Sequence, residues 1–294
     1  MEKLAARAKI NLFLDVKEKR PDGYHEISTI MQNVTLVDSI EFSENKTGPQ
    51  VVYTDCPACD FHDDIILKAW QALRKKTGRD MLFTAQVKKV IPVAAGLGGG
   101  SADAAVALVG LNRLFDLGLS NADLVYLASG IGADVPFFLS GGTAIASGAG
   151  ETLKSVVVMP DCDIVIIKPP LDVSTARAYQ DYDDFIESGG IVRRDIDIES
   201  MLSALKAGDY DAVCGALFNS FEPVMFARHP EIAAAKAAAI KDGADAALMS
   251  GSGSTVFALT RNSETAGRIA NNAARSAAVV HIVKPCKTAI VELD

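Results

Sequence analysis

The sequence predicts an α+β fold in two domains. The chain of 294 residues is longer than one hydrophobic core usually supports. Apolar residues make up 49% and charged residues 22%, which is ordinary for a globular protein. The elements predicted for the second half run helix, strand, strand, helix, strand, and this order is typical of α+β folds. We expect a junction near residues 148–160, with domains at 1–155 and 156–294.

The first elements follow from apolar patterning and turn chemistry. AKINLFLDV at 8–16 is rich in buried-strand residues and predicts a first strand. RPDGYH at 20–25 contains Pro and Gly at turn positions. A second strand is expected at 34–42. Residues 65–76 have helical spacing, and Gly78 marks the end of that helix.

The next stretch alternates strands and helices. Residues 82–90 resemble a strand, and the residues after a run of glycines predict a helix at 101–115. A second helix is expected at 121–129, because Gly130 follows it. Residues 143–147 lie between glycine turns and predict a short strand.

The second half starts again with an apolar strand. Residues 163–168 have buried-strand character, and Pro169 and Pro170 end it. An alanine-rich helix is expected at 230–240, before Gly243. The remaining predicted elements are short helices within 198–226, strands at 246–249 and 255–259 around SGSGS, a helix at 263–275 and a final strand at 279–283.

Charge and cysteine content exclude several protein classes. The net charge is −8 and no long basic run occurs, which argues against nucleic acid or an anionic membrane as partner. No apolar run is long enough to span a bilayer, and the N-terminal apolar stretch is too short for a secretory signal. Five cysteines fit a reducing compartment. We therefore expect a cytoplasmic enzyme or binding protein.

The most informative segment is IPVAAGLGGGSADAAVAL at 91–108, where four of the five residues from Gly96 to Gly100 are glycine. Glycine lets a ligand approach the backbone, and a helix start offers unpaired N–H groups to an anion. The Walker A pattern fails because no lysine precedes Ser101, and the dinucleotide and protein-kinase glycine patterns fail on spacing. The loop is predicted to bind phosphate; the alternative is a helix packed closely on a sheet through its glycines.

Four stretches together resemble the GHMP kinases, the family of galactokinase, homoserine kinase and mevalonate kinase. PVAAGLGGGSADAA at 92–105 is similar to the family's ATP-phosphate loop. GADVP at 132–136 resembles the segment with its catalytic aspartate, and SGSGSTVF at 250–257 resembles its C-terminal glycine motif. AKINLFL at 8–14 with RPDGYH at 20–25 resembles the first motif of the member that acts on a cytidine diphosphate substrate.

The resemblance implies a two-domain GHMP kinase fold with the active site in the cleft between the domains. It also implies transfer of phosphate from ATP, with Mg²⁺, to the 2-hydroxyl of 4-diphosphocytidyl-2-C-methyl-D-erythritol in the non-mevalonate route to isoprenoids. Partners would then be ATP and this small molecule. Two alternatives stay open: a mevalonate or homoserine type of GHMP kinase, and a non-catalytic nucleotide-binding protein of the same fold.

Residue roles are carried over from the matching motifs. Asp134 is expected to be the general base and Lys9 its partner, although alone they would be read as a turn carboxylate and a surface lysine. Ser101 could contact a phosphate or Mg²⁺, or could only cap the helix. The remaining expected contacts fall into two sets: for ATP, Lys89, Pro92, Gly96, Leu97, Gly98, Gly99, Gly100, Ser101 and Ala102; for the cytidine substrate, Asn11, Tyr24, His25 and Tyr179.

Some positions depart from the family pattern. Asp64 stands where an asparagine beside the adenine is expected, and Ser254 replaces a proline, which should loosen the third motif. No glutamate suited to bind a metal is evident, so no metal ligand is predicted. Cys56 and Cys59 form a single C-x-x-C, and we expect free thiols there because a zinc site needs four ligands.

Overall fold

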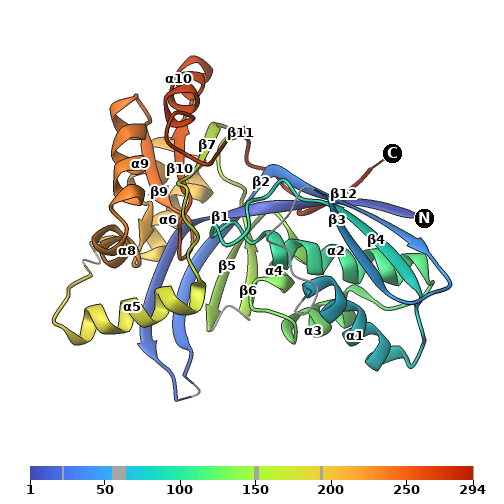
Figure 1. Cartoon of the computed structure of the whole chain (residues 1–294). Coiled ribbons are helices and arrows are strands. Elements are labelled where there is room, and N and C mark those ends of the chain that lie inside the picture. The colour runs from blue at the N-terminus through green and yellow to red at the C-terminus, as the bar shows by residue number, and fades with distance from the viewer. Residues whose placement is uncertain (22, 55–63, 149–151, 193–194, 294) are drawn as a thin grey trace.

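The computed structural model describes residues 1–21, 23–54, 64–148, 152–192 and 195–293. Within them the chain forms two sheets covered by helices (Figure 1). The larger sheet contains β1 (Glu2–Lys19), β2 (His25–Glu44), β3 (Gln50–Thr54), β4 (Phe83–Lys88), β5 (Thr143–Gly148), β6 (Thr152–Val156), β8 (Phe218–Asn219) and β12 (Ile290–Glu292). The smaller sheet contains β7 (Asp163–Lys168), β9 (Ala246–Met249), β10 (Val256–Thr260) and β11 (Val279–Val283).

Helices group with these two sheets. In Figure 1, α1 to α4 lie together beside the larger sheet, while α9 and α10 accompany the smaller one. The helices of the first group are α1 (Ile65–Thr77), α2 (Gly99–Leu114), α3 (Asn121–Ser129) and α4 (Val135–Ser140). The others are α5 (Thr175–Glu187), α6 (Ile198–Ala207), α7 (Tyr210–Gly215), α8 (Glu222–Arg228), α9 (Pro230–Lys241) and α10 (Ser263–Ala273). The predicted α+β class is confirmed.

Most strand pairs are antiparallel. The larger sheet has the order β12-β1-β2-β4-β3, with β5 on β2, β6 on β5 and β8 on β1. The smaller sheet has the order β11-β7-β10-β9. β8 and β12 come from the second half of the chain, yet both pair with β1. The predicted domain boundary between residues 155 and 156 stays a prediction.

β1 is the strand that positions the site. It is 18 residues long, and every side chain from residue 8 to residue 16 is buried. Leu4 and Ala6 belong to the apolar cluster around α2. Ile10 belongs to a second cluster under α6 and α7, and Val16 to a third under α8 and α9. Such burial on both faces explains why AKINLFLDV reads as a nearly continuous apolar run.

α2 is the central helix of the first half. Its sequence is rich in alanine, and ten of its residues are buried. Small side chains let it pack closely on the larger sheet: a Cβ added at Gly110 would lie 2.7 Å from the Phe42 ring. This packing holds the start of the helix, directly after the glycine loop, in a fixed place.

Sequence patterns located most elements but missed several. The predicted final strand at 279–283 is β11, but it is not the last, because β12 follows it. β3, β6, β8 and α4 were not among the predicted elements. Cys56 and Cys59 lie outside the described residues. No helix in the described part of the chain combines the length and apolarity needed to cross a bilayer.

Candidate active site

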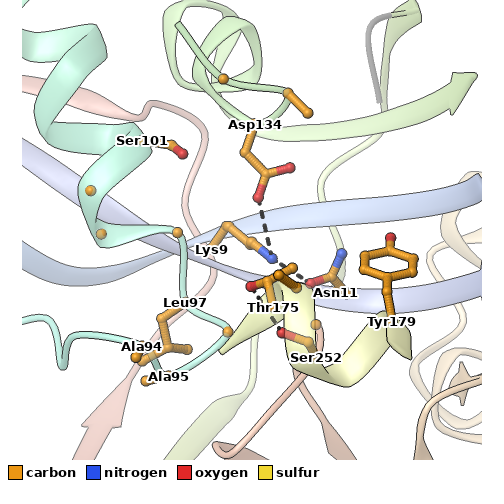
Figure 2. A pocket seen from close by; sticks show the side chains of 18 of the residues that line it. Lys9, Asn11, Ala94, Ala95, Leu97, Ser101, Asp134, Thr175, Tyr179 and Ser252 are labelled. Carbon is orange, nitrogen blue, oxygen red and sulfur yellow. Dashed lines mark hydrogen bonds and ion pairs between the residues drawn. The ribbon is translucent and has the colours of Figure 1, made fainter. Parts of the chain in front are cut away.

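One large cavity collects most of the predicted site residues. Its volume is about 1290 Å³, and its wall includes residues of β1, the glycine loop, the segment before α4, α5 and the β9–β10 turn. Both halves of the chain therefore contribute to it. Figure 2 shows Lys9 and Asn11 on β1, with Asp134, Thr175, Tyr179 and Ser252 arranged around them.

The glycine loop leads directly into the start of α2. Gly98 is the N-cap, with φ 70°, and no side chain caps the helix. Ala102 N–H donates to the Gly98 carbonyl, as in a regular first turn. Ser101 is the third helical residue, so the alternative that it caps the helix is wrong. The first-turn N–H groups before Ala102 thus have no side-chain acceptor and are suited to bind an anion.

Close packing also explains three of the glycines. A Cβ at Gly96 would lie 2.1 Å from the Ser250 carbonyl oxygen, one at Gly98 2.8 Å from Phe138 Cζ, and one at Gly99 2.9 Å from Ile91 Cγ2. At Gly100 the nearest atom would be 3.9 Å away. These three positions leave no room for a side chain, but the nearest atoms belong to the β9–β10 turn, to α4 and to Ile91 and not to a sheet, whereas Gly100 leaves open space at the cavity wall.

Lys9 and Asp134 meet in the cavity although 125 positions separate them. Lys9 Nζ lies 3.6 Å from Asp134 Oδ2 and donates a hydrogen bond of 2.6 Å to Asn11 Oδ1. Asn11 in turn donates to Thr29 Oγ1 at 2.8 Å, which fixes the amide. The Lys9 side chain is 5% exposed and that of Asp134 36%. Burial lowers the pKa of Lys9, and the Asp134 carboxylate opposes that shift.

Lys89 lies between two buried carboxylates. Its Nζ donates to Asp38 Oδ2 at 2.5 Å and to Asp103 Oδ2 at 2.6 Å. Asp38 also accepts the N–H groups of Val90 and Ile91, whereas Asp103 Oδ1 is buried without a hydrogen-bond partner. One ammonium cannot neutralise two carboxylates. Because Asp103 has fewer donors, burial raises its pKa to about 7 despite the attraction of Lys89.

The raised pKa of Asp103 predicts a pH-dependent stability difference. From pH 4 to 7 the folded carboxyl keeps a proton that the unfolded chain has released, so stability falls as pH rises through this window. The amide in Asp103→Asn is neutral at every pH in this range, so the variant does not have this pH-dependent loss of stability. Between pH 4 and 8 the free energy of unfolding of the variant should rise relative to wild type, by an amount on the order of a few kcal/mol. Urea unfolding of both proteins at several pH values measures this, and parallel curves would contradict it.

The predicted cytidine residues gather at one end of the cavity. His25 Nε2 lies 2.8 Å from Asp183 Oδ1, and the His25 ring stacks on Tyr179 with centroids 5.1 Å apart. Tyr179 packs edge-on against Phe221, and burial raises its pKa to about 12. Tyr24 is 68% exposed at the cavity rim. Tyr179 is thus both a packing residue and a wall residue.

All but one of the predicted site residues line this cavity. The exception is Ala102. Its side chain is buried in the cluster around α2, and its N–H donates a hydrogen bond to the Gly98 carbonyl. The expected contact of Ala102 with ATP stays a prediction that the cavity lining does not support. Its place in the motif reflects helix packing, because an alanine fits where α2 meets the sheet.

Two departures from the family pattern have structural explanations. Asp64 is the N-cap of α1: its Oδ1 accepts from Ile66 N at 2.7 Å, and Tyr53 donates to its Oδ2. Ser254 is fully buried and donates to the Leu171 carbonyl at 2.7 Å. This bond ties the third motif down, so the expected loosening is wrong.

Sequence reasoning missed several residues of the cavity wall. Thr175 Oγ1 lies 3.2 Å from Ser252 Oγ, and Asp183 reaches both His25 and Lys19. Asp183 lies four residues after Tyr179 on α5, so helical spacing could have placed it on the same face. Asp38 lies behind the wall, where it binds Lys89, and it had no such signal because Lys89 lies on a distant segment. Among the described residues no group of three His, Cys, Asp or Glu could hold a metal ion.

Comparison with known protein families gives matches in both halves. The family model "GHMP kinases N terminal domain" matches residues 64–142, and "GHMP kinases C terminal" matches residues 201–279. The chain is 44% identical over 268 residues to 4-diphosphocytidyl-2-C-methyl-D-erythritol kinase of Pelotomaculum thermopropionicum, covering 90% of this chain and 91% of that protein. It is 42% identical over 268 residues to the Bacillus pumilus protein of the same name, with 90% of each chain covered.

Solved structures show the same similarity. A crystal structure of 4-(cytidine 5'-diphospho)-2C-methyl-D-erythritol kinase superposes with a TM-score of 0.80 at 31% identity, covering 96% of this chain and 98% of that one. Homoserine kinase from Cytophaga hutchinsonii superposes with a TM-score of 0.76 at 18% identity, covering 99% and 97%. The second match concerns the fold alone.

Proposed function

The chain belongs to the 4-diphosphocytidyl-2-C-methyl-D-erythritol kinases of the GHMP kinase family, and from this we propose how its cavity transfers phosphate. The reaction is the ATP-dependent phosphorylation of the 2-hydroxyl of 4-diphosphocytidyl-2-C-methyl-D-erythritol in the non-mevalonate route to isoprenoids. The observation that carries the residue assignment is the pair of Lys9 and Asp134, held together at one wall of a cavity large enough for two substrates.

In the proposed chemical step, Asp134 accepts the proton of the substrate hydroxyl. The hydroxyl oxygen then forms a bond to the γ-phosphorus, the bond from this phosphorus to the β–γ bridging oxygen breaks, and ADP leaves. The ammonium of Lys9 lies beside the reacting groups and stabilises negative charge on the transferring phosphoryl group. Asn11 holds that ammonium in place through its hydrogen bond of 2.6 Å.

We propose that ATP binds along the glycine loop. The N–H groups at Gly98–Ser101 would contact the phosphates, with Gly96 and Leu97 shaping the loop. Lys89 and Pro92 lie on the adjacent wall, where the base and ribose would sit. Mg²⁺ usually binds through phosphate oxygens, waters and one or two protein oxygens. The Ser101 hydroxyl on the cavity wall is a suitable oxygen for this ion, and the ion would offset phosphate charge.

We propose that Tyr24, His25 and Tyr179 form the cytidine subsite. An aromatic face suits a flat base. Tyr179 lies on the cavity wall across from the start of α2 (Figure 2). Asp183 fixes one nitrogen of the His25 ring at 2.8 Å. The other ring nitrogen is then available to the base or its ribose.

Tyr179→Ala should weaken binding of the cytidine substrate alone. Loss of stacking removes roughly 0.5–1.5 kcal/mol beyond buried area, which corresponds to a rise of several-fold in KM for that substrate. The KM for ATP should stay nearly unchanged, and Tyr179→Phe, which keeps the ring, should behave like wild type. Steady-state kinetics with each substrate varied in turn measures this; equal changes in both KM values would contradict the subsite.

The overall proposal is tested by a coupled assay of ADP release. The cytidine substrate should be used far more efficiently than mevalonate or homoserine, and no ADP should form without an acceptor. Preference for mevalonate or homoserine would place the protein among other GHMP kinases. ATP binding without turnover of any of the three would indicate a non-catalytic member.

We further propose that the reaction takes place in the cytoplasm with small molecules as its only required partners. ATP is supplied there, and the three cysteines of the described chain, Cys162, Cys214 and Cys286, are free thiols.

A further inference from the structure

The turn between β9 and β10 forms part of the cavity wall next to Lys9. Ser250 Oγ donates to the Gly96 carbonyl at 2.9 Å, which joins the turn to the glycine loop. A Cβ at Gly251 would lie 3.4 Å from Lys9 Nζ, so the backbone there is in close contact with the ammonium. Gly251 and Ser252 line the cavity. The conformation of this turn therefore decides which backbone groups face the substrates.

Asn219 holds this turn from behind. Its Nδ2 donates to the Met249 carbonyl at 2.7 Å and to the Gly251 carbonyl at 2.8 Å, so both amide hydrogens are used on the turn. Its Oδ1 accepts Phe221 N–H at 2.9 Å. The side chain is buried, with 4% of the residue exposed, and it does not line the main cavity. All the hydrogen-bonding groups of the Asn219 side chain are therefore used in holding the turn and the start of the segment that follows Asn219.

The anchor of Asn219 is the strand that carries Lys9. Asn219 pairs with Leu14 through β8 and β1, and Ser220 N–H donates to the Leu14 carbonyl at 2.9 Å. Ser220 Oγ also donates to Asp15 Oδ1 at 2.8 Å. β1 therefore carries Lys9 and also holds the turn through Asn219. The position of the turn relative to Lys9 is thus fixed by a single strand.

Fixing the Gly251 carbonyl also fixes the next N–H group. In a trans peptide unit the carbonyl and the following N–H point in opposite directions. The Gly251 carbonyl points to Asn219, so the Ser252 N–H points in the opposite direction, away from Asn219, and Ser252 is one of the residues that line the cavity. This N–H has no hydrogen-bond acceptor among the residues that the structure describes.

We infer that Asn219 is a positioning residue that orients the Ser252 N–H into the cavity as a donor to a phosphate oxygen. The inference rests on the proposed function, which supplies the phosphate. A preorganised backbone donor contributes most where negative charge develops, so its loss should reduce kcat more than binding. Asn219 itself touches no substrate and acts only through the turn.

The test compares Asn219→Ala with Ser220→Ala. Both variants lose buried hydrogen bonds of the same segment, but only the first releases the turn. Asn219→Ala should lower kcat by about 10- to 100-fold, with KM values within about threefold of wild type. Ser220→Ala should lower the Tm while keeping kcat within about threefold of wild type. Asn219→Ser, which keeps one donor, should give an intermediate kcat and replaces the alanine variant if that one does not fold.

Hydrogen exchange gives a readout that does not depend on the substrate. In the ligand-free protein, the amides of residues 250–255 should exchange at least about tenfold faster in Asn219→Ala than in Ser220→Ala, because the turn loses its two anchors. Unchanged exchange and kcat, or equal loss of kcat in both variants, would overturn the inference. If wild type does not phosphorylate the cytidine substrate, the proposed function fails, and exchange alone decides the role of Asn219.

Discussion

Asp134→Asn is expected to lower kcat by about 10²–10⁴-fold, the range typical of a removed general base. Asparagine keeps the size of the side chain but cannot accept the hydroxyl proton. The KM values should change much less, because the carboxylate contributes to the chemical step and not to ground-state binding. The fold should persist, since Asp134 caps α4 without a side-chain hydrogen bond. Single-turnover kinetics separates the chemical step from product release.

A matched control for this variant is Asp161→Asn. Asp161 Oδ1 lies 3.6 Å from Lys284 Nζ, the same separation as between Asp134 and Lys9, but Asp161 does not line the cavity. Removing this exposed pair should leave kcat unchanged and alter stability by less than about 1 kcal/mol. If Asp134→Asn retained near-wild-type turnover with chemistry rate-limiting, the assignment of the general base would be rejected.

Gly98→Ala is expected to lower kcat by on the order of 10²-fold, because it moves Lys9. The new Cβ would lie 2.8 Å from Phe138 Cζ and 3.0 Å from Lys9 Cγ. Phe138 is 1% exposed, so both its ring and the Lys9 stem must give way to the new Cβ, and we expect Lys9 to be displaced. The effect on ATP affinity, measured by calorimetry, should be smaller than the effect on turnover, because the methyl group points at Lys9 and not into open space.

The control for Gly98→Ala is Gly118→Ala. The two glycines have φ of 70° and 69°, so both substitutions cause similar backbone strain, roughly 1 kcal/mol. Around Gly118 no atom lies within 4 Å of the new Cβ. A kcat as high in Gly98→Ala as in Gly118→Ala would show that backbone strain, and not displacement of Lys9, accounts for any change.

Local features of the site could be predicted from sequence, whereas its assembly could not. Glycines before an alanine-rich run indicate a helix start, and α2 begins within two residues of the predicted position. The pairing of Lys9 with Asp134 depends on packing over 125 positions, and only the family resemblance suggested it. Asp38 and Asn219 gave no sequence signal, because their roles consist of contacts with distant segments.

Single residues were misjudged where local chemistry and packing compete. Ser101 has the residue type of a helix cap, yet the left-handed Gly98 begins the helix and leaves the serine inside it. Asp64 departs from the asparagine expected beside the adenine, and local chemistry explains its residue type, because its carboxylate caps α1 and accepts from Tyr53. The strands β8 and β12 are too short to show a period-two pattern, and their pairing with β1 is purely tertiary.

The length of β1 has a consequence for how this protein loses its structure. One continuous strand of 18 residues contributes side chains to all three apolar clusters. Neither half can melt without withdrawing the same strand from the other half, so heat or denaturant should produce one cooperative transition. A fragment of the first half would expose the part of β1 that packs against the second half, and a fragment of the second half would expose the apolar surface that β1 covers, so both would tend to aggregate. The kinase is thus one unit of stability although its chain forms two sheets.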